Sequence, residues 1–523
     1  MALGRTSILR HNLVSIVCIT FFVIIFLCTQ PALDSASLST SPRLSRITGG
    51  RFGVKTSQLH FIIPASHTSE RLCYNLVSAA ANRYPAPQLM GWHGVGELDA
   101  SKTHLAKLRA IMRYLDSLGP AEDDDLVLVV DAYDVIHQLP PQVMIERYFD
   151  IAHQADIALA KRFDMTLKEL HSRNLRQTVF WGPDKICFPH DPRAPRCWAV
   201  PPSPLAEEFG PNSGNGDMEF NDPHWLNSGT VMGPVDDMRR VLRATMAEID
   251  NTWDANFQFR ESDQYYVSNV WAKQEYWRSL QLTQGADVAG GPSDRFVPET
   301  RLNDSDAELH IAIEYESSLF QTKAAYNTFF GYLEFSQAGH KANMSIDVLN
   351  LGQQFKPYEI DMPMNVLQAL TQLFDSVPEA HAGVEAKDWI RTVKLGVNYV
   401  SKQIYGLWHC TGDKQWIDVE YPLLWWYPYA ESLVKAAVKS SQNGQLISSK
   451  PIAGRKWASK AYHAGPETPG ANEYGGAWSD EESGRFVGWG ELCGPYEGML
   501  FQGERGAGAP PEAGTPLTRR SGR

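Results

Sequence analysis

Two carboxylates at the end of an apolar segment are the residues of this chain that most directly suggest chemistry. The segment LVLVVDAYDVI (126–136) places Asp131 and Asp134 directly after five apolar residues. Such a pair can converge at a turn on Mg²⁺ or Mn²⁺, which take oxygen ligands and bridge to substrate phosphates. The same pattern also fits a solvated turn in which Asp134 caps a loop. The apolar strand favours the metal, because strand ends in an α/β sheet face the ligand crevice.

The segment WHCTGDKQW (408–416) contains groups that would complete such a centre. His409 can bind a metal through its neutral imidazole, although a histidine satisfied within the core is the ordinary alternative. Gly412 lets the backbone come close to a ligand, and Lys414 can neutralise a phosphate. Together with the aspartates, these residues supply the charge stabilisation that a departing nucleoside diphosphate requires.

Two further polar positions are candidates for handling a sugar or an acceptor. Asn227 opens the small turn Asn-Ser-Gly (227–229), which suits a sugar hydroxyl but is also an ordinary turn sequence. Asp263 opens a helix-like stretch. Its carboxylate could hold an acceptor hydroxyl or act as a base, or it could simply complement the positive end of the helix.

These residues must be positioned by an alternation of strands and helices. A helix predicted over 101–118, with Ser101 as its cap, precedes the strand at 126–130. A helix from 140 and a strand over 156–162 follow. This alternation predicts an α/β fold with a mostly parallel sheet and helices on both faces. We also expect a loop over 168–225 and a helix over 383–404.

The N-terminus indicates a membrane anchor. Residues 13–28 are apolar apart from Ser15 and Thr20, and they follow two arginines. We therefore expect a cytoplasmic tail (1–12), a transmembrane signal anchor (13–29) and a flexible stem (30–56). A cleaved signal peptide is the alternative. A globular domain over 57–440 and a largely disordered tail over 441–523 complete the predicted organisation.

Charge and cysteine content agree with a secretory protein that does not bind nucleic acid. The net charge of −12 argues against a phosphate-backbone partner. Five cysteines follow the apolar segment, so at least one stays unpaired, and Cys187 and Cys197 are the best disulfide candidates. Asn303 and Asn343 lie in N-glycosylation triplets.

The order of these motifs resembles nucleotide-sugar transferases of the GT-A fold, and most closely the glycosyltransferase domain of the procollagen lysyl hydroxylases. The similar elements are VDAYDVI, LNSG, ESDQ, SLFQ and HCTGDK, preceded by GVGE (94–97). By this resemblance, the acidic run before Asp263 is reduced and an insertion lies between Gln321 and His409, and we expect no hydroxylase module. A collagen acceptor is therefore not implied. By resemblance, the metal ligands are Asp131, Asp134 and His409, the diphosphate faces Lys107, Gly412 and Lys414, the donor sugar or acceptor faces Asn227 and Asp263, and Trp92 stacks on uracil.

The resemblance implies a metal-dependent glycosyltransferase that moves a hexose from a UDP-sugar to an acceptor hydroxyl on a protein or glycan. It would be held in the Golgi or endoplasmic reticulum membrane with its catalytic domain in the lumen. A non-catalytic luminal module that binds glycan or protein is the alternative. A metal-dependent phosphohydrolase would need a second metal cluster, which the sequence does not show.

Overall fold

The computed structural model describes residues 54–286, 291–298, 307–441, 446–462, 472–481 and 484–506. The predicted cytoplasmic tail, the anchor, nearly all of the stem and the Asn303 triplet lie outside these ranges. Within them, no helix combines the length and apolar composition of a membrane span. Asn343 is described and exposed.

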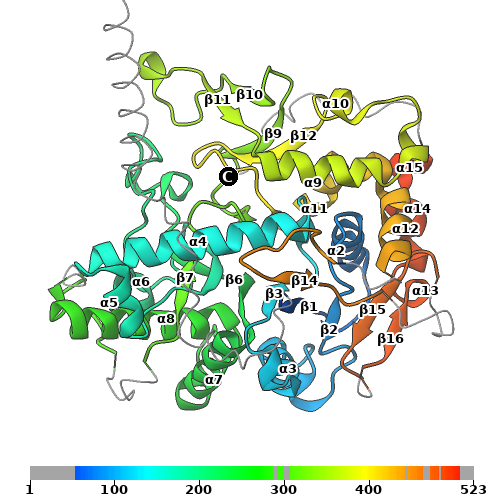
Figure 1. Cartoon of the computed structure of the whole chain (residues 1–523). Coiled ribbons are helices and arrows are strands. Elements are labelled where there is room, and N and C mark those ends of the chain that lie inside the picture. The colour runs from blue at the N-terminus through cyan, green and yellow to red at the C-terminus, as the bar shows by residue number, and fades with distance from the viewer. Residues whose placement is uncertain are drawn as a thin grey trace, which may run out of the picture. The chain divides into compact units, whose positions relative to one another are not determined.

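A nine-stranded sheet forms the centre of the structure (Figure 1). Strand β1 is parallel to β2, β3 and β14, whereas β6 is antiparallel to both of its neighbours. The prediction of an α/β fold with a largely parallel sheet is therefore confirmed. The strands, in spatial order, are β16 (Phe486–Gly488), β15 (Gly476–Ser479), β2 (Gln88–Met90), β1 (Thr56–Pro64), β3 (Leu126–Val130), β6 (Trp225–Pro234), β5 (Val179–Asp184) and β7 (Ile311–Ile313), with β14 (Lys456–Ala458) also on β1.

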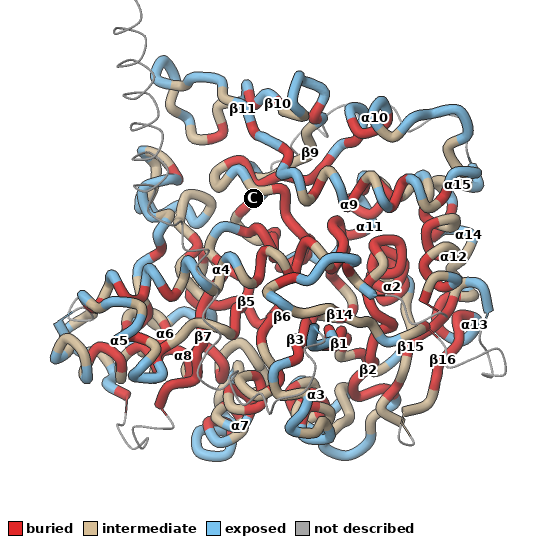
Figure 2. The backbone as a smooth tube through the Cα atoms, in the orientation of Figure 1, coloured by how far each residue is buried: buried red, intermediate tan, exposed pale blue. Residues whose placement is uncertain are grey.

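Apolar side chains on both faces of the sheet build two cores. In β3, residues 126, 128 and 130 face one core and residues 127 and 129 face the other, because successive side chains of a strand alternate. Figure 2 shows this buried centre running through β1, β3 and β6. Helices α2 (Glu70–Ala81), α4 (Pro141–Arg162) and α12 (Ala430–Ser441) pack in the first core, and α3 (Ala106–Ser117), α7 (Val235–Thr252) and α8 (Asp263–Thr283) pack in the second.

A second, three-stranded sheet brings distant parts of the chain together. Strand β13 (Leu407–His409) lies between β4 (Val135–His137), to which it is antiparallel, and β8 (Phe320–Thr322), to which it is parallel. The chain between β8 and β13 contains the predicted insertion. Its elements are β9 (Phe330–Glu334), β10 (Lys341–Met344), β11 (Tyr358–Asp361), α9 (Met364–Asp375), α10 (Ala386–Trp389) and β12 (Lys394–Asn398).

The helix predicted over 383–404 is wrong. Only the four residues of α10 are helical there, and β12 pairs with β9 about sixty residues earlier in the chain. The predicted strand over 156–162 is also wrong, because α4 continues through it to Arg162. The loop predicted over 168–225 contains α5 (Leu167–Ser172), α6 (Pro195–Trp198) and the central strand β5. Helix α3 begins at Ala106, so Ser101 does not cap it.

The C-terminal segment belongs to the fold, so the prediction of a largely disordered tail is wrong for its described residues. Strands β14 and β15 extend the central sheet, and a disulfide joins Cys73 of α2 to Cys493. Trp457 and Phe501 are fully buried, which gives the segment enough apolar surface to fold onto the domain. The helices here are α13 (Trp489–Leu492), α14 (Glu497–Leu500) and α15 (Gln502–Arg505), and α11 (Trp416–Glu420) follows β13.

The cysteine predictions agree with the structure. Cys187 and Cys197 form a disulfide, as predicted. Cys410 is buried and unpaired, the one free thiol among the described residues.

Candidate metal centre

Three predicted metal ligands meet at the carboxyl end of β3. Asp131 directly follows that strand, Asp134 directly precedes β4, and His409 ends β13. One ligand atom from each of the three residues lies within 4.8 Å of the other two. The Nε2 atom of His409 is 3.2 Å from Oδ2 of Asp134 and 3.7 Å from Oδ2 of Asp131. The sheet therefore gathers a nitrogen and two carboxylates from chain segments far apart in sequence.

Backbone hydrogen bonds fix these three segments against one another. In the pairing of β13 with β4, His409 lies opposite Val135. The Cys410 N–H donates to the Asp134 carbonyl at 2.7 Å, and the Asp131 N–H donates to the Gly229 carbonyl at 2.8 Å. The ligand geometry is thus set by strand pairing, which holds a site more rigidly than side-chain contacts alone.

Tyr133, between the two aspartates, anchors their loop to the end of β1. Its hydroxyl accepts hydrogen bonds from the backbone N–H groups of Ser66 at 3.1 Å and His67 at 3.3 Å. Its ring stacks on the His67 imidazole, with ring centroids 5.1 Å apart.

Gly229 is required by the close approach of the ligands. A Cβ atom at this position would lie 2.0 Å from Cε1 of His409 and 2.8 Å from Oδ2 of Asp131. No side chain fits there without displacing the imidazole or the carboxylate. The Asn-Ser-Gly segment, predicted as a turn, is instead part of β6, and its glycine makes room for the metal ligands.

Both predicted lysines reach the aspartates. Lys107 pairs with Asp131 at 2.6 Å and with Asp263 at 2.8 Å, and it also donates to the Ser228 carbonyl at 3.1 Å. Lys414 pairs with Asp134. Three carboxylates therefore face two ammonium groups, so one carboxylate charge has no matching lysine among the described residues and could be neutralised by a cation.

The electrostatics of the three carboxylates differ. Burial favours the neutral form of Asp134, but His409 and Lys414 outweigh it and hold the pKa of Asp134 well below its usual range. Burial and the neighbouring Asp134 raise the pKa of Asp131, although Lys107 opposes them. Burial opposes ionisation of Asp263 as well, but Lys107 lowers its pKa. Asp131 is a third exposed, so the open side of the cluster lies at this residue.

The donor set fits a divalent cation. One imidazole nitrogen with two carboxylates suits Mn²⁺ better than Mg²⁺, because Mn²⁺ accepts both kinds of ligand whereas Mg²⁺ prefers oxygen ligands alone. The other ring nitrogen of His409, Nδ1, is buried without a hydrogen-bond partner among the described residues. The Nε2 atom of His409 therefore points at the carboxylates, and no hydrogen bond between Nδ1 and a described residue fixes which of the two ring nitrogens carries the proton.

Asn227 and Asp263 lie beside this cluster together with a residue that the sequence did not reveal, Asp184. Asp263 begins α8, as predicted. The Asn227 side-chain oxygen accepts from the Gly229 N–H at 3.0 Å, and its amide lies 3.4 Å from Asp184. Gln264 also donates to Asp184, at 3.3 Å.

Burial raises the pKa of Asp184 to about 6, even though these two amides stabilise its charged form. Asp184 ends β5, so it would have been a candidate had that strand been recognised in the predicted loop. A carboxyl group that titrates near neutrality beside the metal cluster is able to take or give a proton.

Trp92 and Gly412 differ in their accessibility. Gly412 has φ +79° in an open turn, and a Cβ there would meet no atom within 4 Å among the described residues. Trp92 is only 2% exposed and packs in the core, so its ring presents no free face to a uracil. Its backbone N–H donates to Asp480 of the C-terminal segment at 3.2 Å, and that of Gly91 does so at 2.8 Å. The residues directly before the segment GVGE (94–97), which was expected near a nucleotide, are therefore held by the part of the chain that was predicted to be disordered.

Comparisons with known proteins add no family. No protein-family model matches the chain. No curated protein matches it at a significant level either.

Proposed function

We propose that the protein is a glycosyltransferase of the GT-A fold, which uses a divalent cation to transfer a hexose from a UDP-sugar to an acceptor hydroxyl. The observation that carries the proposal is the meeting of Asp131, Asp134 and His409 within 4.8 Å at the carboxyl end of a central strand. In sheets of this kind that end is where ligands bind.

The cations around the cluster support a diphosphate leaving group. Lys107 and Lys414 each reach one of the two metal-binding aspartates. In the proposed enzyme, Asp131, Asp134 and His409 hold Mn²⁺, which when bound would supply Lewis-acid stabilisation of the departing diphosphate. The two lysines exchange part of their pairing with the aspartates for the phosphate oxygens. Asn227 and Asp263 face the sugar or the acceptor, and the Asn227 amide also lies 3.4 Å from the Asp184 carboxylate.

The disulfides support a luminal location. Two disulfides among the described residues are typical of a protein that folds in an oxidising compartment. We propose that residues 13–29 anchor the chain in the Golgi or endoplasmic reticulum membrane, with the domain in the lumen. Protease protection in sealed microsomes tests this orientation.

Calorimetry with UDP, with and without Mn²⁺, tests the proposed activity on the full chain in detergent. We expect UDP binding that requires Mn²⁺, and a loss of affinity of at least about tenfold for Asp131→Asn. Asp413→Asn is the matched control, because it removes the same charge from an exposed position near the site. Metal-independent binding, or equal affinity in Asp131→Asn, would contradict the metal assignment.

The alternative is a non-catalytic module that keeps the fold and binds a glycan or protein. It is favoured by the engagement of Lys107 with both Asp131 and Asp263, which already neutralises part of the cluster. Release of UDP from UDP-glucose and UDP-galactose separates the two functions. Turnover that depends on Mn²⁺ supports the enzyme, whereas Mn²⁺-dependent UDP binding without turnover of either donor supports the module.

A further inference from the structure

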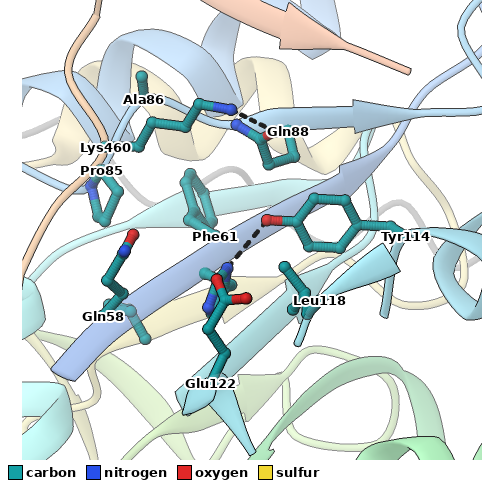
Figure 3. Close-up of a pocket in the computed structure, with 11 residues that line it drawn as sticks. Gln58, Phe61, Pro85, Ala86, Gln88, Tyr114, Leu118, Glu122 and Lys460 are labelled. Carbon is teal, nitrogen blue, oxygen red and sulfur yellow. Dashed lines mark hydrogen bonds between the residues drawn. The ribbon is translucent and has the colours of Figure 1, made fainter. Parts of the chain in front are cut away.

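A pocket of about 290 Å³ lies near the amino end of β1, away from the metal centre at the carboxyl end of β3, and is bounded by β1, β2 and α3. Phe61, Pro85 and Leu118 supply apolar walls. Figure 3 shows Tyr114 and Glu122 reaching into it from one side, and Gln88 and Lys460 joined by a hydrogen bond at the other. His60 also lines the pocket, from the face of β1 opposite to Phe61. The pocket thus combines apolar walls with several potential ligand groups.

Three of these groups are close enough to share a metal ion. One ligand atom from each of His60, Glu122 and Asp125 lies within 4.8 Å of the other two. The Nε2 atom of His60 is 3.5 Å from Oδ2 of Asp125. Ligands that share a tetrahedral Zn²⁺ at about 2.0–2.2 Å lie about 3.3–3.6 Å apart. The distance between these two atoms therefore suits a common cation.

The His60 imidazole is already oriented for such a role. The side chain is 7% exposed, and its Nε2 atom is buried without a hydrogen-bond partner among the described residues. Its other nitrogen, Nδ1, lies 2.9 Å from the Tyr114 hydroxyl. With Nδ1 donating its proton to that oxygen, Nε2 presents a lone pair toward the carboxylates, as metal-binding histidines with a second partner do.

Among the described residues, the carboxylates of Glu122 and Asp125 lack the lysine partners that Asp131 and Asp134 have in the first metal cluster, which consists of Asp131, Asp134 and His409. Asp125 is 4% exposed, and across the described ranges no lysine or arginine lies within 4.0 Å of its carboxylate or that of Glu122. Asp131 and Asp134, in contrast, each have a lysine. A buried carboxylate without a compensating cation is costly, and a bound metal ion removes that cost.

The backbone holds these carboxylates in place. The Gly119 N–H donates to the Glu122 carboxylate at 2.9 Å, and the Asp125 N–H donates to the Glu122 carbonyl at 2.9 Å. Asp125 directly precedes β3, while Asp131 directly follows it. The two clusters are therefore about 20 Å apart along the strand, too far to form a two-metal phosphohydrolase centre.

We propose that His60, Glu122 and Asp125 form a second metal site, which binds Zn²⁺ and whose open coordination position faces the pocket. A mixed nitrogen and oxygen donor set with only three protein ligands suits Zn²⁺ better than Mg²⁺ or Ca²⁺, which take six or more oxygens. Three protein ligands leave a fourth position for water or for a small ligand. The site is independent of the proposed transferase activity.

Zinc binding to the full chain in detergent, measured by calorimetry after chelator treatment, tests the site. The measurement uses Asp131→Asn/Asp134→Asn as the background, because this variant removes the first cluster. We expect the background to bind one Zn²⁺ per chain and to melt at a higher temperature with Zn²⁺. Adding His60→Gln or Asp125→Asn should weaken that binding at least tenfold and abolish the shift in melting temperature.

Asp124→Asn is the matched control, since this neighbouring carboxylate is half-exposed and pairs with Lys55 and Arg455. It should leave zinc affinity unchanged. Glu122→Gln replaces Asp125→Asn if the latter fails to fold, because Glu122 is only partly buried. Absence of zinc binding in the background, or equal affinity in His60→Gln, would overturn the proposal.

Discussion

The Nε2 atom of His409 lies 3.2 Å from Oδ2 of Asp134, although the two residues are 275 positions apart in the chain. The antiparallel pairing of β13 with β4 creates this contact, since it places His409 opposite Val135. A metal held here joins the loop between β3 and β4 to β13, which follows the long segment from β9 to β12. Metal binding should therefore stabilise the folded state as well as the site.

Replacing His409 should weaken Mn²⁺ binding. His409→Asn removes the nitrogen ligand and leaves two carboxylates, so we expect Mn²⁺ affinity to fall at least about tenfold. Titration of Mn²⁺ followed by electron paramagnetic resonance measures the free ion directly. His153→Asn, at an exposed position of α4, is the control. Equal affinities in the two variants would remove His409 from the ligand set.

Adding one methyl group at Gly229 should disrupt the same centre. In Gly229→Ala the new Cβ would lie 2.0 Å from Cε1 of His409, so the imidazole must move away from the aspartates. We expect Mn²⁺ binding to fall as far as in His409→Asn, and stability to fall by about 1–3 kcal/mol from overpacking. Gly490→Ala is the control, because its Cβ meets no described atom within 4 Å. Retained Mn²⁺ affinity in Gly229→Ala would contradict the packing of His409 against this strand.

The partly buried Asp184 should make stability depend on pH. Its pKa is about 6 in the folded protein, above the value of about 3.9 in an unfolded chain. The folded state therefore keeps the proton to higher pH, and the unfolding free energy falls as pH rises from about 4 to 6. Asp184→Asn should remove that fall and be more stable than the wild type at pH 7, by about 1–3 kcal/mol.

Urea unfolding of both proteins at pH 4, 5, 6 and 7 measures the difference. The two stability curves should converge near pH 4, separate between pH 4 and pH 6, and stay apart at pH 7. Curves that stay parallel over this range would show that Asp184 is not the group that titrates.

The disulfide between Cys73 and Cys493 should hold the C-terminal segment on the domain. Cys73→Ser/Cys493→Ser is expected to lower the unfolding free energy by about 2–5 kcal/mol and to expose the segment to proteolysis. Cys187→Ser/Cys197→Ser should cost less, because its bridge spans a separation of only 10 residues, against 420. Thermal unfolding and limited trypsin digestion of both variants test the order. A larger loss in the second variant would contradict it.

Short-range patterns predicted several elements correctly. The apolar run before Asp131 is strand β3 at the predicted residues, and Asp263 begins a helix as its position indicated. Both features depend on residues adjacent in sequence, namely an uninterrupted apolar stretch and a capping serine at position 262. The disulfide between Cys187 and Cys197, which closes a short loop, was likewise predicted from residues close together in sequence.

Elements whose stability comes from distant partners were missed. Strand β12 lies in a predicted helix, and β14 and β15 lie in a predicted disordered tail, because each is short and is held by pairing with a strand far away in the chain. Trp92 was expected to meet a nucleotide, but its ring is enclosed by the core. Burial of this kind depends on what packs around a residue, which spacing along the chain does not express.

The sequence by itself determined which chemical groups could bind a metal and a phosphate, and that Asp131 and Asp134 stand at the end of a strand. Only the tertiary structure decided that His409 meets them, that Lys107 lies between Asp131 and Asp263, and that Asp184 is partly buried beside Asn227. The physical reason is that side-chain type and local spacing are properties of neighbouring residues. Ligand convergence, ion pairing and desolvation arise instead from strand pairing and packing between segments hundreds of residues apart.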